Sequence, residues 1–112
     1  MPSIRIISGV FGGRNLKTLD KKKLGPTPAR MREQLFSWLR PEINNFTCLD
    51  LFAGSGALGF EAISNGAKKV VFIEQNLEIY KCLKFNCEKL NLLEQVQAYR
   101  QSAENYVRRK KG

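Results

Sequence analysis

Residues that could bind a nucleotide-like ligand lie at the end of an apolar stretch in the middle of the chain. Residues 46–52 are typical of a buried strand, and a glycine loop with the spacing Gly54-x-Gly56-x-x-Gly59 follows. A strand, a glycine loop and a helix in this order present backbone N–H groups to such a ligand. Gly54 suits the tight turn, Gly56 a close approach of the ligand, and Gly59 close packing of the helix on the strand. Because the glycine spacing alone is a weak signal, the neighbouring acids decide which ligand is expected.

Two acids stand at the ends of consecutive predicted strands. Asp50 precedes Gly54 by four residues, and Glu74 ends the apolar run 70–74, twenty residues after that glycine. An acid in the position of Glu74 can accept hydrogen bonds from both ribose hydroxyls of an adenosine, which NAD and S-adenosylmethionine (SAM) both contain. A dinucleotide-binding strand usually stays apolar up to its first glycine. Asp50 therefore favours SAM, whose methionine end carries a positive ammonium group.

The elements that must position these residues alternate between strands and helices. We predict a β-hairpin over 4–19 with its turn at Gly12-Gly13, a linker over 21–28, a helix capped by Thr27 and stopped by Pro41, strands over 46–51, 70–74 and 95–99, and helices over 57–65, 77–90 and 103–109. From residue 46 onward the alternation is β-α-β-α-β-α. This alternation predicts an α/β fold with a parallel sheet that is covered by helices.

Two of the predicted helices carry apolar stripes that should face the core. The first stripe comprises Met31, Leu35, Phe36 and Leu39, with Trp38 also expected in the core, and the second comprises Leu77, Tyr80, Leu83, Cys87 and Leu90. Three parallel strands in the order 3-2-1 would leave the first strand as an open apolar edge. The chain alone is therefore expected to be marginally stable or to self-associate.

The composition fits one small domain. The chain has 112 residues, of which 43% are hydrophobic, enough to form a core. No apolar run approaches the roughly 20 residues of a membrane span, and the N-terminus lacks the apolar segment of a secretory signal. The sequence has no histidine, and its three cysteines, Cys48, Cys82 and Cys87, lack metal-ligand spacing. We therefore expect reduced thiols, no metal and no membrane partner in a cytoplasmic protein.

Positive charge is concentrated at the N-terminus. Residues 1–40 carry nine Lys or Arg against two acids, residues 41–102 are nearly neutral, and residues 103–112 carry four Lys or Arg against one acid. We divide the chain accordingly into a basic arm, 1–40, and a cofactor-binding half-domain, 41–112. A basic arm suggests a polyanionic partner, RNA or DNA, with a solvated charged surface as the alternative.

Two groups of residues resemble those of known methyltransferases. Asp50-x-Phe52-Ala53-Gly54-Ser55-Gly56-x-x-Gly59, followed by Glu74, is similar to the cofactor motif of SAM-dependent methyltransferases. The segments Arg5-Ile6-Ile7-Ser8-Gly9, Gly13-Arg14-x-Leu16, Pro26-Thr27 and Arg30-x-Arg32-Glu33-x-Leu35-Phe36-x-Trp38-Leu39 resemble the RsmD family, and this resemblance covers nearly the whole chain. It implies a Rossmann-like fold, SAM as cofactor, and methylation of a guanine N2 amino group in bacterial 16S ribosomal RNA.

The resemblance also implies which residues bind the cofactor and the RNA. Asp50, Gly54 and Gly56 would frame the methionine end of SAM, and Glu74 would hold the ribose. The implied cofactor set is Asp50, Phe52, Ala53, Gly54, Ser55, Gly56, Glu74, Gln75, Ser102 and Ala103. The implied RNA-binding set, on the hairpin and the helix start, is Arg5, Arg14, Lys17, Arg30 and Arg32. A salt-bridged helix surface is the alternative interpretation for the last two arginines.

The sequence also departs from the family pattern. Ser102 stands where an acid or amide usually contacts the adenine, Gly25 where an arginine is usual, and Ala29 where an aspartate is common. The chain contains no Asn/Asp-Pro-Pro-Tyr/Phe motif, whose polar group and aromatic ring position the target base in these enzymes. We therefore assign no catalytic residue. We expect the chain to be the N-terminal portion of such an enzyme, which would be monomeric when complete.

Three other classes of protein remain as alternatives. A non-catalytic RNA-binding protein with a vestigial SAM pocket would bind RNA in a salt-sensitive manner without binding SAM. A cytosine-C5 DNA methyltransferase shares the Asp-Leu-Phe-Ala-Gly start but needs a Pro-Cys nucleophile, and no cysteine of this chain follows a proline. An NAD dehydrogenase is disfavoured by Asp50 and by the basic arm.

Overall fold

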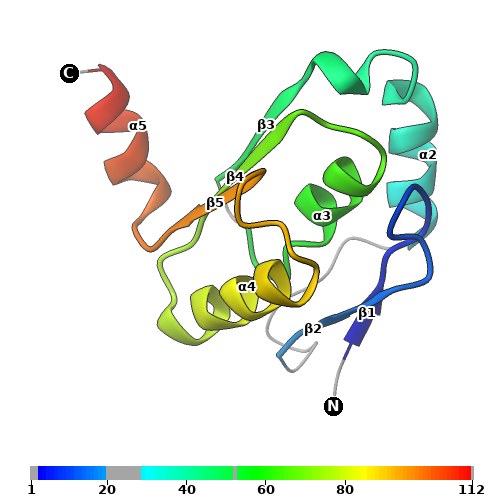
Figure 1. Ribbon diagram of the computed structural model, residues 1–112. Helices are drawn as coiled ribbons and strands as arrows, with labels where there is room; N and C mark the ends of the chain where they lie inside the picture. The colour runs from blue at the N-terminus through cyan, green and yellow to red at the C-terminus, as the bar shows by residue number, and fades with distance from the viewer. Residues whose placement is uncertain (1–2, 20–28, 52, 112) are drawn as a thin grey trace.

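The computed structural model of the chain describes residues 3–19, 29–51 and 53–111 (Figure 1). Its elements are β1 (Ser3–Arg5), β2 (Asn15–Lys17), α2 (Ala29–Leu39), the 3-10 turn η1 (Ile43–Asn45), β3 (Thr47–Asp50), α3 (Ala57–Ser64), β4 (Lys69–Ile73), α4 (Leu77–Lys89), β5 (Val96–Tyr99) and α5 (Ala103–Lys111). The predicted order of elements is confirmed, apart from η1, which the sequence did not indicate. The expected linker and the Thr27 cap lie outside the described residues.

The central sheet has three parallel strands in the order β3-β4-β5, as predicted. Side chains alternate between its two faces. Val70, Phe72 and Val96 are buried on the face that α3 and α4 cover. Among the described strands, β3 pairs with β4 alone, so the predicted open edge is present, and Leu49 on this strand is 49% exposed.

The first helix of the alternation packs closely on the sheet at Gly59. A Cβ built on this glycine would lie 2.3 Å from the Phe72 ring and 3.0 Å from Val70. No real side chain tolerates the shorter distance, so α3 can approach β4 only through a glycine at this position. The predicted role of Gly59 in helix–strand packing is therefore confirmed.

The N-terminal segment forms the predicted hairpin. Strands β1 and β2 are antiparallel, with Ile4 opposite Leu16. Gly13, in the connection between them, has a φ of +88°, which favours glycine. Leu16 and Ile6 are fully buried in the same core cluster as Phe60 and Phe72. The hairpin therefore shares the core of the sheet domain.

A side chain of α4 continues the hydrogen bonding of β2. The Asn86 Oδ1 accepts a hydrogen bond from the Lys17 N–H at 2.9 Å, and the Asn86 Nδ2 donates to the Lys17 carbonyl, also at 2.9 Å. This amide binds both polar groups of one backbone residue, as a neighbouring strand would. Asn86 is fully buried, so the contact fixes the hairpin to α4 away from water.

The predicted apolar face of α2 is wider than the buried one. Phe36 is 3% exposed, but Trp38 is 71% exposed and Met31 59%, so the expectation that Trp38 packs in the core is wrong. The physical reason is that α2 packs mainly against α3, which covers only a narrow stripe of its surface. Leu83 and Cys87 of α4 and Leu90, its C-cap, are buried as predicted, whereas Leu77, the first residue of the helix, is 41% exposed.

No helix within the described ranges is both long and apolar enough to cross a bilayer. The same residues hold no cluster of three or more side chains suited to a metal ion. The three cysteines are free thiols, and Cys87 is 2% exposed.

Candidate functional site

The glycine loop lies where β3 meets α3, at the carboxyl end of the parallel sheet. The Ala53 N–H donates to the Ile73 carbonyl at 3.2 Å, which extends the β3–β4 pairing by one step beyond the strands. The Gly56 N–H then closes a tight turn on the Ala53 carbonyl at 2.8 Å. Gly54 and Gly56 have φ angles of +53° and +82°, a backbone region that side chains rarely adopt. The loop therefore turns as the sequence predicts.

Packing inside the molecule gives Gly56 a further reason to be glycine. A Cβ at this position would lie 2.6 Å from Leu83 and 2.6 Å from the Phe60 ring. The missing side chain therefore leaves room for the core as well as permitting the positive φ. Gly56 also serves as the N-cap of α3 and has no side chain to cap it, and the first N–H of the helix, that of Ala57, donates to the Ser55 Oγ instead.

Glu74 connects the glycine loop with the start of α4. One of its carboxylate oxygens, Oε1, accepts from the Gly54 N–H at 3.0 Å, and the other, Oε2, accepts from the Asn76 N–H at 3.0 Å. Asn76 in turn caps α4, since its Oδ1 accepts from the Ile79 N–H. Glu74 itself is half-buried. The two loops expected to hold a nucleoside are thus held together by one accessible carboxylate.

The remaining predicted cofactor residues near Glu74 and the glycine loop differ in how far they are exposed. Asp50 ends β3 directly opposite Phe72 of β4 and is half-buried. Ser55 is half-buried, its Oγ accepting from the Ala57 N–H at 3.3 Å, and Gln75 is exposed. Phe52 lies outside the described residues.

Ser102 and Ala103 follow β5 at the same edge of the sheet. The Ser102 Oγ accepts from the Asn105 N–H at 3.0 Å and so caps the first turn of α5. The serine that departs from the family pattern therefore has a local structural task, and both residues remain half-buried.

A cavity of about 470 Å³ lies on the other face of the sheet. Val71, Gln97 and Tyr99 line it from the strands, and Tyr106 and Arg109 line it from α5. None of the predicted cofactor residues contributes to it. The candidate site is therefore defined by the loops at the strand ends rather than by this cavity.

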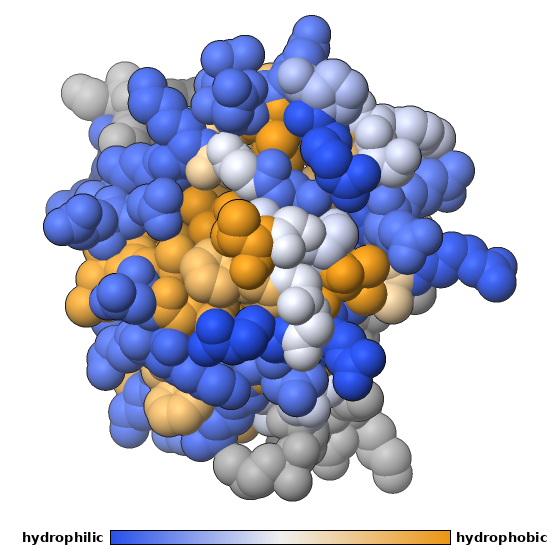
Figure 2. All heavy atoms as spheres, turned by 45° about the vertical axis from the view of Figure 1, so that its right-hand side comes forward, coloured by the Kyte–Doolittle hydropathy of each residue, from blue (hydrophilic) through white to orange (hydrophobic). Residues whose placement is uncertain are grey.

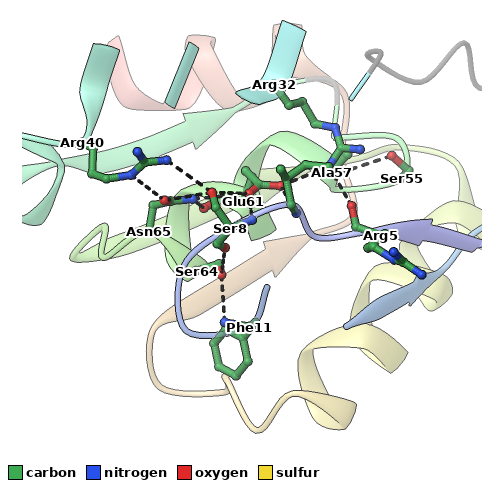
Figure 3. Close-up of polar contacts among 11 residues, drawn as sticks. Arg5, Ser8, Phe11, Arg32, Arg40, Ser55, Ala57, Glu61, Ser64 and Asn65 are labelled. Carbon is green, nitrogen blue, oxygen red and sulfur yellow. Dashed lines mark hydrogen bonds and ion pairs between the residues drawn. The ribbon is translucent and has the colours of Figure 1, made fainter. Parts of the chain in front are cut away.

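The arm is attached to α3 by a buried carboxylate, that of Glu61 (Figure 3). Its two oxygens accept from the Ile7 N–H at 3.0 Å and from the Ser8 N–H at 2.9 Å. The Arg32 guanidinium forms an ion pair with it at 3.1 Å and also donates to the Arg5 carbonyl. Glu61 is 0% exposed, and its charge is balanced by Arg32. One side chain of α3 thus fixes both α2 and the segment that follows β1.

The end of α3 makes a second attachment to the arm. The Val10 N–H donates to the Ser64 carbonyl at 2.8 Å, and the Phe11 N–H donates to the Ser64 Oγ at 2.9 Å. Gly9 passes so close to this turn that a Cβ would lie 1.9 Å from the Ser64 carbonyl oxygen. Gly9 also has a φ of +84°, so two independent constraints require a glycine there.

The predicted RNA-binding residues divide into exposed and buried groups. Arg5, Arg14 and Arg30 are exposed, and Lys17 is half-buried with its ammonium 5.0 Å from the centre of the Phe85 ring. Arg32 is 3% exposed, because its guanidinium is committed to Glu61. The prediction that Arg32 contacts RNA is corrected on this ground, and the alternative of a salt-bridged arginine describes it.

Burial also determines the state of the thiols. It raises the pKa of the Cys87 thiol to about 11, above its ordinary value. For Cys48, burial and then the neighbouring Asp50 carboxylate raise the pKa. These thiols are therefore protonated near neutral pH and are poor nucleophiles.

Sequence reasoning did not find Glu61, Asn86 or Gly9 as fixing points. Glu61 gave a usable signal, since it is the single charged residue among Ala57–Ser64, a helix in which seven of eight residues are buried. A lone acid in such a helix needs a buried partner. Asn86 and Gly9 gave no comparable signal, because their partners are backbone groups of distant segments.

A parallel sheet with a glycine loop after its first strand and an acid after its second is the arrangement of a Rossmann-like fold, and the similar solved structures with this fold are methyltransferases. Residues 4–112 match the model of the family described as "Conserved hypothetical protein 95", and the chain belongs to this family, the RsmD family.

Individual relatives agree with this assignment. The chain is 44% identical over 106 residues to the ribosomal RNA small subunit methyltransferase D of Haemophilus influenzae, covering 94% of this chain and 55% of that protein. It is 52% identical over 73 residues to the protein of the same name from Escherichia coli K12, covering 65% of this chain and 37% of that protein. A solved structure titled "Putative methyltransferase yhhF from Escherichia coli" superposes with a TM-score of 0.85 at 38% identity, covering 94% of this chain and 56% of that one. The chain thus spans about half the length of the relatives that it matches.

Proposed function

We propose that this chain is the SAM-binding and RNA-contacting part of a methyltransferase that acts on small-subunit ribosomal RNA, at the N2 amino group of a guanine. The observation that supports the proposal most directly is the position of Glu74, which follows the second strand of the sheet and accepts from both the Gly54 N–H of the glycine loop and the Asn76 N–H at the start of α4. Membership of the RsmD family and the names of the relatives support the reaction and the RNA substrate. A substrate of this kind would place the protein in the cytoplasm.

The chemistry of the donor set fits SAM. A carboxylate has about four acceptor positions, so Glu74 can accept from ribose hydroxyls while it keeps the Gly54 and Asn76 N–H groups. Asp50 at the end of β3 supplies a negative charge for the methionine ammonium. The start of α3, where the N-cap Gly56 has no side chain, supplies partial positive charge for the methionine carboxylate. SAM would supply the electrophilic methyl group.

The chain's own contribution to the reaction is binding and orientation. The glycine loop and Glu74 would fix the nucleoside, and the exposed Arg5, Arg14 and Arg30 would attract the RNA backbone. Transfer of a methyl group to an amine depends mainly on alignment of the nitrogen with the methyl carbon. We assign no residue of this chain to that alignment.

The first test is SAM binding by isothermal titration calorimetry on the 112-residue chain. We expect saturable binding that is lost in both Asp50→Ala and Glu74→Ala, because each removes a charge or acceptor that recognises one end of the ligand. Lys81→Ala, an exposed change on α4, serves as the control and should leave binding unchanged.

The same chain is then titrated with a labelled RNA at two salt concentrations. Salt-sensitive RNA binding without SAM binding by the folded chain would contradict the cofactor part of the proposal and favour the RNA-binding alternative. Sedimentation velocity and calorimetry on the same sample test the prediction that the open β3 edge makes the chain marginally stable or self-associating, and a monomer that melts cooperatively would contradict it.

A further inference from the structure

A polar groove separates the N-terminal part of the arm, residues 3–19, from α2, on the side of the molecule that is at the right in Figure 1 and is brought forward in Figure 2. It has a volume of about 620 Å³ and is lined by Arg30, Glu33, Gln34 and Ser37 of α2, by Arg40 directly after this helix, and by Ile7 and Ser8 of the N-terminal segment. A second hollow of about 550 Å³ continues past Arg40 along Gly9 and the end of α3. Because both hollows share Ser8 and Arg40, they form one track, which we call the arm–helix groove.

The spacing of the lining residues shows that one face of α2 is devoted to this groove. Positions 30, 33, 34, 37 and 40 recur at helical intervals of three and four residues, and all are polar. The buried stripe of the same helix, Arg32 and Phe36, points instead to α3. The polar side chains of α2 itself, at positions 30, 33, 34 and 37, therefore lie outside the buried stripe that packs on α3.

Arg40 is held in place within the groove. Its Nε donates to the Asn65 Oδ1 at 3.0 Å, and one terminal nitrogen donates to the Ser8 Oγ at 3.3 Å. A guanidinium has five N–H donors, so Arg40, which lines the groove, keeps donors available for a ligand there. A pre-oriented guanidinium binds a phosphate with a smaller loss of side-chain entropy than a mobile one.

The charges along the groove favour an anion. The buried Glu61 below the arm is neutralised by Arg32, which leaves Arg30 and Arg40 against Glu33. Glu33 makes no hydrogen bond or ion pair with any described residue, so its charge acts on whatever enters the groove. The net charge of the lining is positive, and the surrounding arm adds Arg5 and Arg14.

The groove also leads toward the candidate cofactor site. Arg32 is paired with Glu61 within α3, whereas Arg40 contacts Asn65 just beyond the end of this helix. Glu61 is one helical turn before Asn65, and Figure 3 shows the Arg32 contact on the side of α3 that is nearer to its first residue, Ala57, and to Ser55 of the glycine loop. The Arg30 end of the groove is therefore nearer to the glycine loop than the Arg40 end.

We propose that the arm–helix groove binds the sugar-phosphate backbone of the RNA substrate, with Arg40 as a fixed phosphate contact and Arg30 as a second contact closer to the cofactor site. This inference rests on the proposed function and adds a path for the RNA strand to it. Arg40 was not among the residues that the sequence indicated for RNA binding, since nothing in the sequence reveals its contacts with Ser8 and Asn65.

The test uses two charge-neutralising substitutions with opposite expected effects. Dissociation constants are measured by fluorescence anisotropy with a labelled, guanine-containing 20-nucleotide RNA. Arg40→Gln should weaken binding by roughly three- to tenfold and lower the slope of log K against log salt by about 0.7, the value for one contact to a single strand. Glu33→Gln removes the opposing charge and should strengthen binding by about two- to threefold.

The two substitutions are expected to change RNA affinity in opposite directions. The test therefore remains informative even if a variant is less stable, because loss of structure cannot increase affinity. Arg109→Gln, the same charge change on α5 at the opposite side of the molecule, is the matched control and should alter affinity less than twofold. If the wild-type chain binds RNA and both Arg40→Gln and Glu33→Gln bind it with the wild-type affinity, the groove assignment is wrong but the proposed function is unaffected. No salt-sensitive RNA binding by the folded wild-type chain would overturn the RNA part of the proposed function together with it.

Discussion

Two glutamates of this molecule make nearly the same hydrogen bonds to the backbone but differ in their exposure and in their charged neighbours. Glu61 on α3 and Glu74 after β4 each accept hydrogen bonds from two backbone N–H groups at 2.9–3.0 Å. Glu61 is fully buried and paired with Arg32, whereas Glu74 is half-buried with no basic partner among the described contacts.

The difference separates a structural carboxylate from one that can bind a ligand. Around Glu61 the acceptor positions are taken by the arm and by Arg32, and no water can replace them. Around Glu74 the two N–H groups leave acceptor positions open to solvent. The hydrogen bonds within the protein therefore look alike, and it is exposure and counter-charge that distinguish the two roles.

The largest expected effect is at Glu61. Glu61→Gln should lower the free energy of unfolding by about 3–5 kcal/mol, because it leaves Arg32 as a buried charge without its partner. Arg32→Met should have a similar effect, because it leaves the buried Glu61 carboxylate without its partner. Chemical denaturation followed by circular dichroism measures both. A cost of less than about 1 kcal/mol would mean that the arm does not depend on this pair.

The double variant Arg32→Met/Glu61→Leu separates the contribution of the Arg32–Glu61 ion pair from that of the hydrogen bonds between Glu61 and the arm backbone. Replacing a buried ion pair with apolar residues often leaves stability unchanged when the two side chains make no other hydrogen bonds. Here the Ile7 and Ser8 N–H groups would lose their acceptor as well, so the double variant should remain about 2 kcal/mol or more below wild type. Recovery of wild-type stability would show that the backbone contacts of Glu61 contribute little.

The next effect tests the arm itself through two glycines with similar backbone angles. Gly9 and Gly13 have φ angles of +84° and +88°, but only at Gly9 would a Cβ meet another atom, the Ser64 carbonyl oxygen at 1.9 Å. Gly13→Ala should cost about 1 kcal/mol from backbone strain, and Gly9→Ala about 2–4 kcal/mol from strain and displacement of the arm. Thermal unfolding of both variants measures the difference. Equal costs would show that the arm can move away from α3.

These positions also show what the sequence could and could not predict. The glycine loop, the acid at 74 and the β-α-β-α-β-α order were predictable, because each depends on local periodicity or on spacing within a short stretch. The burial of Arg32 was not, because it depends on pairing with Glu61 of a distant segment, and the exposure of Trp38 was not, because it depends on how little of α2 is covered by α3. Helical periodicity identifies the side chains that share a face but not the width of that face in contact with a neighbour.

The smallest expected effect on stability is at Glu74, and it decides whether the comparison holds. Glu74→Gln keeps one acceptor oxygen and loses the other, so one of the Gly54 and Asn76 N–H groups turns to solvent instead. Because this end of the sheet is accessible to water, the loss should be about 0.5–1.5 kcal/mol, measured by the same denaturation experiment as for Glu61→Gln. A loss as large as that for Glu61→Gln would make Glu74 a structural residue and remove the basis for assigning it to the ribose. A small loss of stability together with loss of SAM binding would mean that the negative charge at this position serves the ligand rather than the fold.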